Sequence, residues 1–169
     1  ISISEDNEWC SFGIDTVSRR QYTIKVKNLK TGEILSEAIE NTTGSVAWAS
    51  DNKTFFYTKK DPQTLRSDKI CRHVVGSDVV KDELVFHEKD DTFYTFVYKE
   101  KSKKYLVIGS TSTLTSEYQI LEANQPEGEF RIFQKRVRGV EYSISHYGDS
   151  FYVVTNKDKA TNFKLMKTP

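Results

Sequence analysis

Proline, cysteine and glycine are scarce in this sequence, which has three, two and eight of them among 169 residues. So little proline and glycine excludes collagen-like and low-complexity chains. Two cysteines do not make a disulfide framework, so Cys10 and Cys71 are expected to be reduced and partly buried, in a cytoplasmic protein.

The sequence also lacks a charge excess and a long apolar run. Its 25 Lys and Arg residues against 24 Asp and Glu residues leave a formal net charge of +1. This removes the strongest argument for a nucleic-acid partner. The longest apolar runs, such as 105–108, fall far short of the roughly 18–20 residues of a membrane span. The chain opens with Ile1 and stops at Pro169, and we expect it to be a fragment of a longer protein.

Motifs that carry chemistry are missing as well. There is no G-x-S-x-G nucleophile elbow, no C-x-x-C or H-E-x-x-H metal pattern, and no glycine-rich phosphate loop. The histidines His73, His87 and His146 are far apart in sequence, so each is expected to be structural. We therefore predict no catalytic residue, no cofactor and no metal in this chain.

The sequence has a dominant period of two, typical of half-buried β-strands. Hydrophobic residues make up 37% of the chain and aromatic residues 12%, enough for a packed core. No segment has the apolar spacing of a helix, so the chain is predicted to be all-β with antiparallel sheets. The strand-like runs are 22–27, 46–48, 54–58, 70–75, 83–87, 94–98, 104–108, 117–121, 129–133, 142–145, 150–155 and 162–166.

A turn followed by an apolar strand recurs through the chain. The turns begin near Asp6, Asp51, Ser102 and Gly148, and a second landmark places Gly32 in step with Gly76. Turns and strands that repeat every ~40–50 residues indicate propeller blades. We predict four units, roughly 1–44, 45–90, 91–138 and an incomplete 139–169, which form an arc of a larger propeller. A β-sandwich without any repeat is the alternative fold.

Within the repeats, Trp48, Phe55 and Tyr57 are predicted to pack between sheets, because alternation buries one face of a strand. The basic clusters 101–104 and 135–138 are interpreted as solvated turns. The pair Arg19 and Arg20 directly precedes a strand, and paired guanidinium groups bind carboxylates well.

Six motifs in order resemble the propeller domain of the oligopeptidase B branch of the prolyl oligopeptidase family of serine peptidases. These motifs are Ser18-Arg19-Arg20-Gln21-Tyr22 with Asn28-Leu29-x-Thr31-Gly32, Trp48 with Asp51-x-x-Thr54-Phe55-x-Tyr57, Glu88-Lys89-Asp90-Asp91-Thr92-x-Tyr94, Glu141-Tyr142-Ser143-x-x-His146-Tyr147, Phe151-Tyr152, and Asn162-Phe163-x-Leu165. The resemblance covers nearly the whole chain.

The resemblance implies a seven-bladed propeller that caps a catalytic α/β-hydrolase domain of the same parent chain. That domain is absent from this chain, which is expected to be catalytically silent. In the family the propeller admits only short peptides, and the parent enzyme cuts after Arg or Lys. Arg19 and Arg20 are then candidates for an interdomain or substrate contact.

Two other functions remain open. A non-catalytic propeller scaffold could bind another protein through its blade faces, and a β-sandwich could bind carbohydrate with Trp9 and Trp48 as stacking platforms. An arc of blades has exposed apolar faces and open strand edges, so we also expect self-association of this chain.

Overall fold

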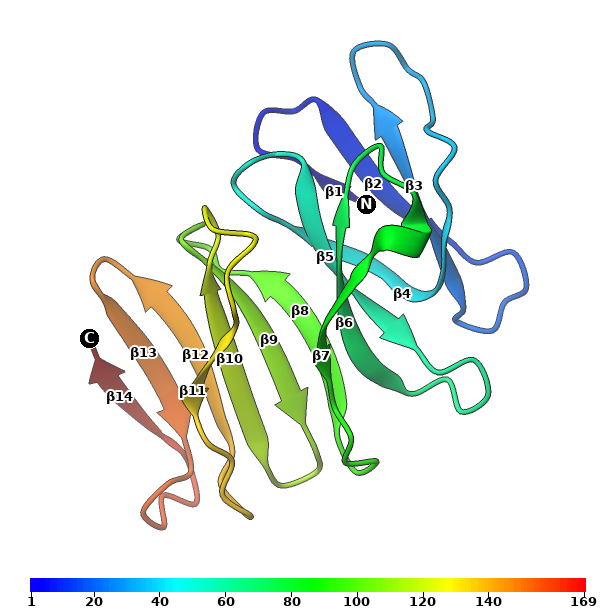
Figure 1. Ribbon diagram of the computed structural model, residues 1–169. Coiled ribbons are helices and arrows are strands. Elements are labelled where there is room, and N and C mark those ends of the chain that lie inside the picture. Colours follow the sequence, from blue (N-terminus) through cyan, green and yellow to red (C-terminus); the bar gives the residue numbers. More distant parts are fainter.

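The computed structural model describes residues 1–169 and is all-β, apart from one turn of 3₁₀-helix, η1 (Val79–Lys81) (Figure 1). The strands are β1 (Ser2–Ile3), β2 (Trp9–Ile14), β3 (Tyr22–Asn28), β4 (Ile39–Trp48), β5 (Thr54–Lys60), β6 (Ser67–Val74), β7 (Glu83–His87), β8 (Tyr94–Lys99), β9 (Tyr105–Thr111), β10 (Ser116–Glu122), β11 (Arg131–Gln134), β12 (Tyr142–Tyr147), β13 (Ser150–Thr155) and β14 (Lys164–Thr168). The predicted fold class is confirmed.

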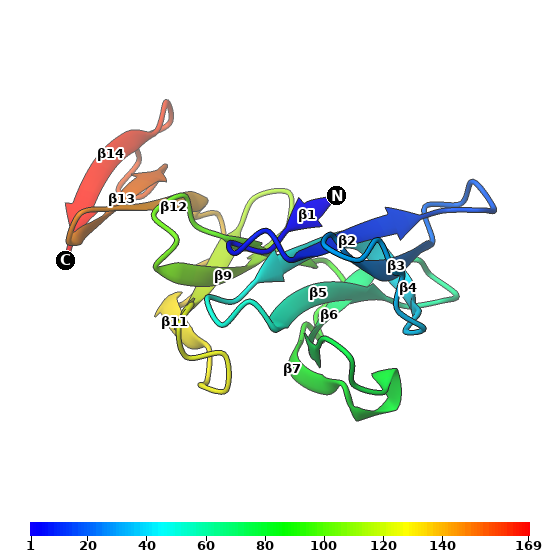
Figure 2. The same ribbon diagram turned by 90° about the horizontal axis from the view of Figure 1, so that it is seen from above.

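The strands form antiparallel sheets in chain order: β1 to β7, β8 to β11, and β12 to β14. The first sheet consists of two ladders that share β4. Thr42 of β4 is paired with Tyr22 of β3 and with Lys59 of β5, whereas Val46 to Trp48 pair only with β5. Figures 1 and 2 show the resulting sheets side by side along the chain, with β14 at one end. No helix is long and apolar enough to cross a membrane.

The repeated turns of the sequence have a repeated conformation. The turns that join β1 to β2, β4 to β5, β8 to β9 and β12 to β13 each contain one residue with positive φ, namely Asn7 (60°), Asn52 (58°), Lys103 (62°) and Gly148 (62°). Asn and Gly tolerate this left-handed region well. The second landmark behaves likewise, because Gly32 and Gly76 have φ of 79° and 82°. The repeat therefore reflects the position of hairpin turns.

A bend in β4 lets this strand serve two ladders. Asn41 and Gly44 both have positive φ, at 57° and 83°. A Cβ on Gly44 would lie 2.8 Å from Cγ of Tyr22, and a Cβ on Gly13 would lie 2.6 Å from Cα of Gly44. Both positions require glycine, because the neighbouring atoms leave no room for a Cβ atom. The sequence analysis did not assign 39–45 to a strand.

The core lies between the sheets, as three apolar clusters. Trp48, Phe55 and Tyr57 are buried, as predicted. Their neighbour Phe56 is buried too, so β5 does not alternate. Phe55 and Phe56 belong to different clusters, because the ladder is covered on both faces. The last strand begins at Lys164, two residues later than predicted, after the positive φ of Phe163.

Candidate functional site

The loops that follow β2, β5, β7, β9 and β11 gather at one end of the molecule, along the lower and right-hand side of Figure 1. We call this end the loop rim; it comprises 15–21, 61–66, 88–93, 112–115 and 135–141. The hairpin turns that carry the repeat lie at the opposite end. The loop rim contains Arg19 and Arg20, the residues that the sequence analysis selected.

The loop that carries Arg19 and Arg20 is fixed through its backbone. The carboxylate of Asp15 accepts hydrogen bonds from the N–H groups of Val17 (3.1 Å) and Arg20 (2.7 Å). Nζ of Lys60 donates to the carbonyl of Arg20 at 2.7 Å, which ties the loop to the next ladder. Both arginine side chains are exposed and take part in no ion pair of the chain. They are therefore free to bind a carboxylate.

Lys60 is itself affected by this arrangement. Burial lowers the pKa of its ammonium group, and the neighbouring charge of Arg20 lowers it further.

A hollow of about 750 Å³ opens beside these residues, lined also by Asp61, Asp68 and Asp91. Oδ2 of the buried Asp68 lies 2.6 Å from Nζ of Lys69, while its Oδ1 has no hydrogen-bond partner. Arg20 thus borders a hollow that contains carboxylates of two different loops and of β6.

Arg66 fixes the loop between β7 and β8. Its guanidinium group donates to the carbonyls of Glu88 (2.8 Å), Phe93 (3.0 Å) and Asp90. The side chains of Asp90 and Thr92 close the same loop with local hydrogen bonds. The motif from Glu88 to Tyr94, part of the family resemblance, therefore accepts the hydrogen bonds of a structural arginine.

Arg136 joins two successive sheets. Its Nη2 lies 2.6 Å from Oε2 of Glu88, which follows β7, and 2.9 Å from Oε1 of Glu117 on β10. Its guanidinium carbon lies 4.0 Å from the centre of the Phe93 ring. Burial disfavours the charge of Arg136, but the hydrogen bonds to both carboxylates outweigh it and raise the pKa. The interpretation of 135–138 as a solvated turn was wrong for Arg136, because its carboxylate partners are distant in sequence.

A second buried network lies between the first two ladders. Nδ1 of His73 lies 2.6 Å from Oδ1 of Asp82, and Nε2 lies 3.6 Å from Oε1 of Glu37. Tyr57 donates its hydroxyl hydrogen to Oδ2 of Asp82 at 2.9 Å. His73 is fully buried and no serine or cysteine hydroxyl or thiol is bonded to it, so the network joins loops rather than activates a nucleophile. No group of three His, Cys, Asp or Glu side chains could hold a metal ion.

The sheet β8 to β11 has four strands, and β4 divides the first sheet into two ladders, β1 to β4 and β4 to β7, of four strands each. Antiparallel four-stranded units that follow one another in chain order are typical of the blades of a β-propeller. All of residues 1–169 match the family model described as prolyl oligopeptidase, N-terminal beta-propeller domain. The chain belongs to this family.

Similar proteins are peptidases that are much longer than this chain. Dipeptidyl aminopeptidase BI of Pseudoxanthomonas mexicana is 41% identical over 167 residues, which are 99% of this chain and 23% of that protein. Protease 2 of Moraxella lacunata is 38% identical over 88% of this chain and 22% of its own length. The solved structure of oligopeptidase B from Leishmania major matches with a TM-score of 0.91 and 28% identity, over all of this chain and 24% of that one. The chain thus spans less than a quarter of these relatives.

Proposed function

We propose that this chain is a substrate-gating part of a serine oligopeptidase that cleaves short peptides after Arg or Lys. The observation that carries the proposal is the match of the whole chain to the propeller domain of the prolyl oligopeptidase family. The named relatives are peptidases, and one similar structure is oligopeptidase B with covalently bound antipain. The chain itself holds no catalytic triad, so catalysis belongs to an α/β-hydrolase domain of the parent.

The division of labour has a physical reason. Acyl transfer needs a preorganised triad and oxyanion hole, and a cover over them excludes water and folded substrates. A cover of this kind must keep its shape while it moves as a unit. The network around Arg136 supports such rigidity, because it links successive sheets at the loop rim.

We assign the contact with the catalytic domain, or with a peptide, to Arg19 and Arg20. Their backbone is fixed by Asp15 and Lys60 while their guanidinium groups are exposed and unpaired. A preorganised loop with free guanidinium groups binds a carboxylate at low entropic cost. The same loop places Arg20 beside the hollow that contains Asp61, Asp68 and Asp91.

The test uses the full-length parent protein. It should hydrolyse short peptides that contain Arg or Lys, and a serine-directed inhibitor should abolish the activity, whereas the isolated chain should show none. The double variant Arg19→Ala/Arg20→Ala should lower kcat/KM by about tenfold or more, the worth of one lost charge-assisted hydrogen bond. The matched control is Lys53→Ala/Lys101→Ala, which removes two exposed cations at the opposite end.

The outcomes separate two conclusions. A parent without peptidase activity would overturn the proposed function and favour a scaffold that binds proteins. If the parent is active but both double variants change kcat/KM equally, the proposed peptidase function stands and the proposed role of Arg19 and Arg20 is wrong.

We further propose self-association of the isolated chain, through the outer face of the last sheet. Tyr147 and Leu165 on this face are 77% and 68% exposed, and Val154, paired with Leu165, is exposed as well. Exposed apolar side chains on one sheet face favour contact with another sheet. Light scattering over a dilution series tests this, and a monomeric mass at the highest concentrations would contradict it.

The predicted units 1–44, 45–90, 91–138 and 139–169 remain our proposal for the blades. A cytoplasmic location is likewise proposed, on the ground that Cys10 and Cys71 are both free thiols.

A further inference from the structure

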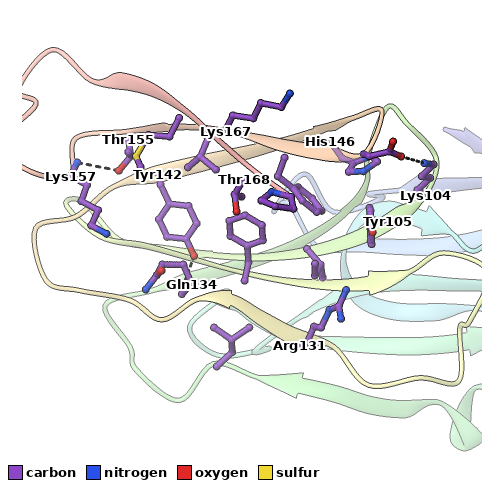
Figure 3. Close-up of a pocket in the computed structure, with 18 of the residues that line it drawn as sticks. Lys104, Tyr105, Arg131, Gln134, Tyr142, His146, Thr155, Lys157, Lys167 and Thr168 are labelled. Carbon is purple, nitrogen blue, oxygen red and sulfur yellow. Dashed lines mark hydrogen bonds and ion pairs between the residues drawn. The ribbon is translucent and has the colours of Figure 1, made fainter.

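The hollow beside Arg20, of about 750 Å³, is built from the middle of the chain. Its lining residues lie between 20 and 94, in three loops of the loop rim and at the adjoining ends of β5, β6 and β8. The strands β5 and β6 are paired on both sides, and β8 packs against both of them. The cavity between the last two sheets differs, because residues 166–169 at the end of the chain form part of its wall (Figure 3). The walls of the hollow are thus formed without either end of the chain.

Asp68 occupies an irregular point of β6 on the wall of this hollow. The pairing of β6 with β5 skips this residue, since Lys69 is opposite Lys59 and Ser67 is opposite Lys60. A bulge of this kind redirects a side chain and is common beside functional sites. Only 5% of the surface of Asp68 is exposed, so its carboxylate has largely lost its contact with water.

The buried carboxylate of Asp68 is only partly satisfied. Its Oδ2 atom lies 2.6 Å from Nζ of Lys69 and 3.5 Å from Nε2 of His87, whereas its Oδ1 atom has no hydrogen-bond partner in the chain. A buried acceptor without a partner costs free energy, which a ligand that donates an N–H group can recover. Asp68 therefore points to a ligand with such a donor.

The unpaired charges of the hollow are of both signs. Lys60 and Arg66 donate to main-chain carbonyl groups of neighbouring loops, so both cations are engaged. Arg20, Asp61 and Asp91 line the hollow and take part in no ion pair of the chain. A guanidinium group binds a carboxylate well, and a carboxylate binds a guanidinium or ammonium group well. The hollow thus matches a ligand that carries one cation and one carboxylate.

A peptide that ends in arginine or lysine has both groups in its last residue. We propose that the hollow binds this residue, with the C-terminal carboxylate at Arg20 and the side-chain cation at Asp68. The volume of the hollow is within the range of small-molecule sites, about 300–1,000 Å³. Peptides of this kind are the products of cleavage after Arg or Lys, so their supply by the parent rests on the proposed function, whereas the binding itself does not.

The probe is N-acetyl-L-arginine. Its amide lacks the carboxylate, and N-acetyl-L-citrulline has nearly the same shape but lacks the cation. Amide shifts in a ¹H–¹⁵N spectrum of the 19.5 kDa chain locate the contact and report whether each variant is folded. N-acetyl-L-arginine should shift the signals of 20, 61–68 and 91, and should bind about tenfold more tightly than either analogue, because each analogue loses one charge-assisted contact.

Two variants assign the two contacts separately. Arg20→Gln should abolish the difference in affinity between the acid and its amide but keep the preference for arginine over citrulline. Asp68→Asn should abolish the preference for arginine over citrulline. Arg138→Gln, which removes an exposed arginine that does not line the hollow, should leave both differences unchanged. The three ligands on the unsubstituted chain test the proposal even where Asp68→Asn does not fold.

Three results would overturn the proposal. They are equal affinity for all three ligands, an equal effect of Arg20→Gln and Arg138→Gln, and shifts confined to residues outside the hollow. A tripeptide that ends in arginine should bind at least as tightly as N-acetyl-L-arginine, and weaker binding would exclude a peptide C-terminus as the ligand. Binding by this chain together with an inactive parent would refute the proposed peptidase function alone.

Discussion

Replacement of Arg136 by leucine should destabilise the chain strongly, because this side chain pairs with two buried carboxylates between successive sheets. Glu88 is 4% exposed and Glu117 8%. Arg136 reaches Glu88 at 2.6 Å and Glu117 at 2.9 and 3.2 Å, from Nη2 and Nε. In Arg136→Leu both carboxylates remain buried without a cation.

The expected cost follows from this geometry. Removal of one partner from a buried ion pair costs about 3–5 kcal/mol, mostly as the penalty for the charge that remains. The Arg136 side chain is 27% exposed, so water can reach part of the site and the lower end applies. We expect a loss of about 3 kcal/mol in the free energy of unfolding, a large share of the roughly 5–15 kcal/mol of a typical domain.

Urea unfolding measures this loss, with a lower midpoint and an unchanged slope. Arg138→Leu is the matched control and should cost less than about 0.5 kcal/mol, since Arg138 is exposed and unpaired. The triple variant Arg136→Leu/Glu88→Gln/Glu117→Gln should recover most of the stability, because no buried charge remains. A triple variant as unstable as Arg136→Leu would refute the reasoning and attribute the cost to lost packing on Phe93.

Three further substitutions test the packing, the bend and one turn. Trp48→Ala should lower the free energy of unfolding in urea by about 3–5 kcal/mol. Trp48→Phe should cost less than about 1.5 kcal/mol, because the buried Nε1 atom of Trp48 has no hydrogen bond to lose. An unchanged midpoint for Trp48→Ala would place this residue on the surface. Gly44→Ala should cost about 1–3 kcal/mol more than Gly76→Ala, which has the same backbone strain but open space around it; equal costs would contradict the argument from close approach. Burial tends to raise the pKa of Asp51, but the hydrogen bonds in its turn lower this pKa overall. Asp51→Asn should therefore cost about 1 kcal/mol of stability at pH 7, and progressively less as the pH falls through the lowered folded-state pKa of Asp51. A stability difference that is constant down to pH 2 would exclude the carboxylate as its source.

The local features of this fold could be predicted from the sequence. Turn residues and apolar strands are close in sequence, and the turn signals at Asn7, Asn52 and Gly148 correspond to a backbone conformation that Asn and Gly favour. The burial of Trp48 followed from its place on a repeated strand, where alternation buries one face. These features need no knowledge of distant partners, so the order of strands and the fold class were accessible.

Features that depend on distant partners were not accessible. A period of two predicts one buried face, but Phe55 and Phe56 are both buried because sheets cover both sides of β5. The segment 39–45 is a strand because it pairs with β3, with Thr42 opposite Tyr22 and Ile39 opposite Ile24. Among candidate site residues, the exposure of Arg19 and Arg20 agrees with their sequence context, while their binding partner remains a prediction.

The two ends of the molecule differ in a way that bears on where a specific partner can bind. The hairpin turns at one end repeat the same backbone conformation in every sheet, at Asn7, Asn52, Lys103 and Gly148. A repeated surface presents similar groups several times and distinguishes partners poorly. The loop rim does not repeat: the loop 15–21 carries Arg19 and Arg20, whereas the loop 88–93 is held by the guanidinium group of Arg66. Its networks also fix backbone positions across sheets, which lowers the entropic cost of binding. Specific recognition, whether of a catalytic domain or of a peptide, is therefore expected at the loop rim.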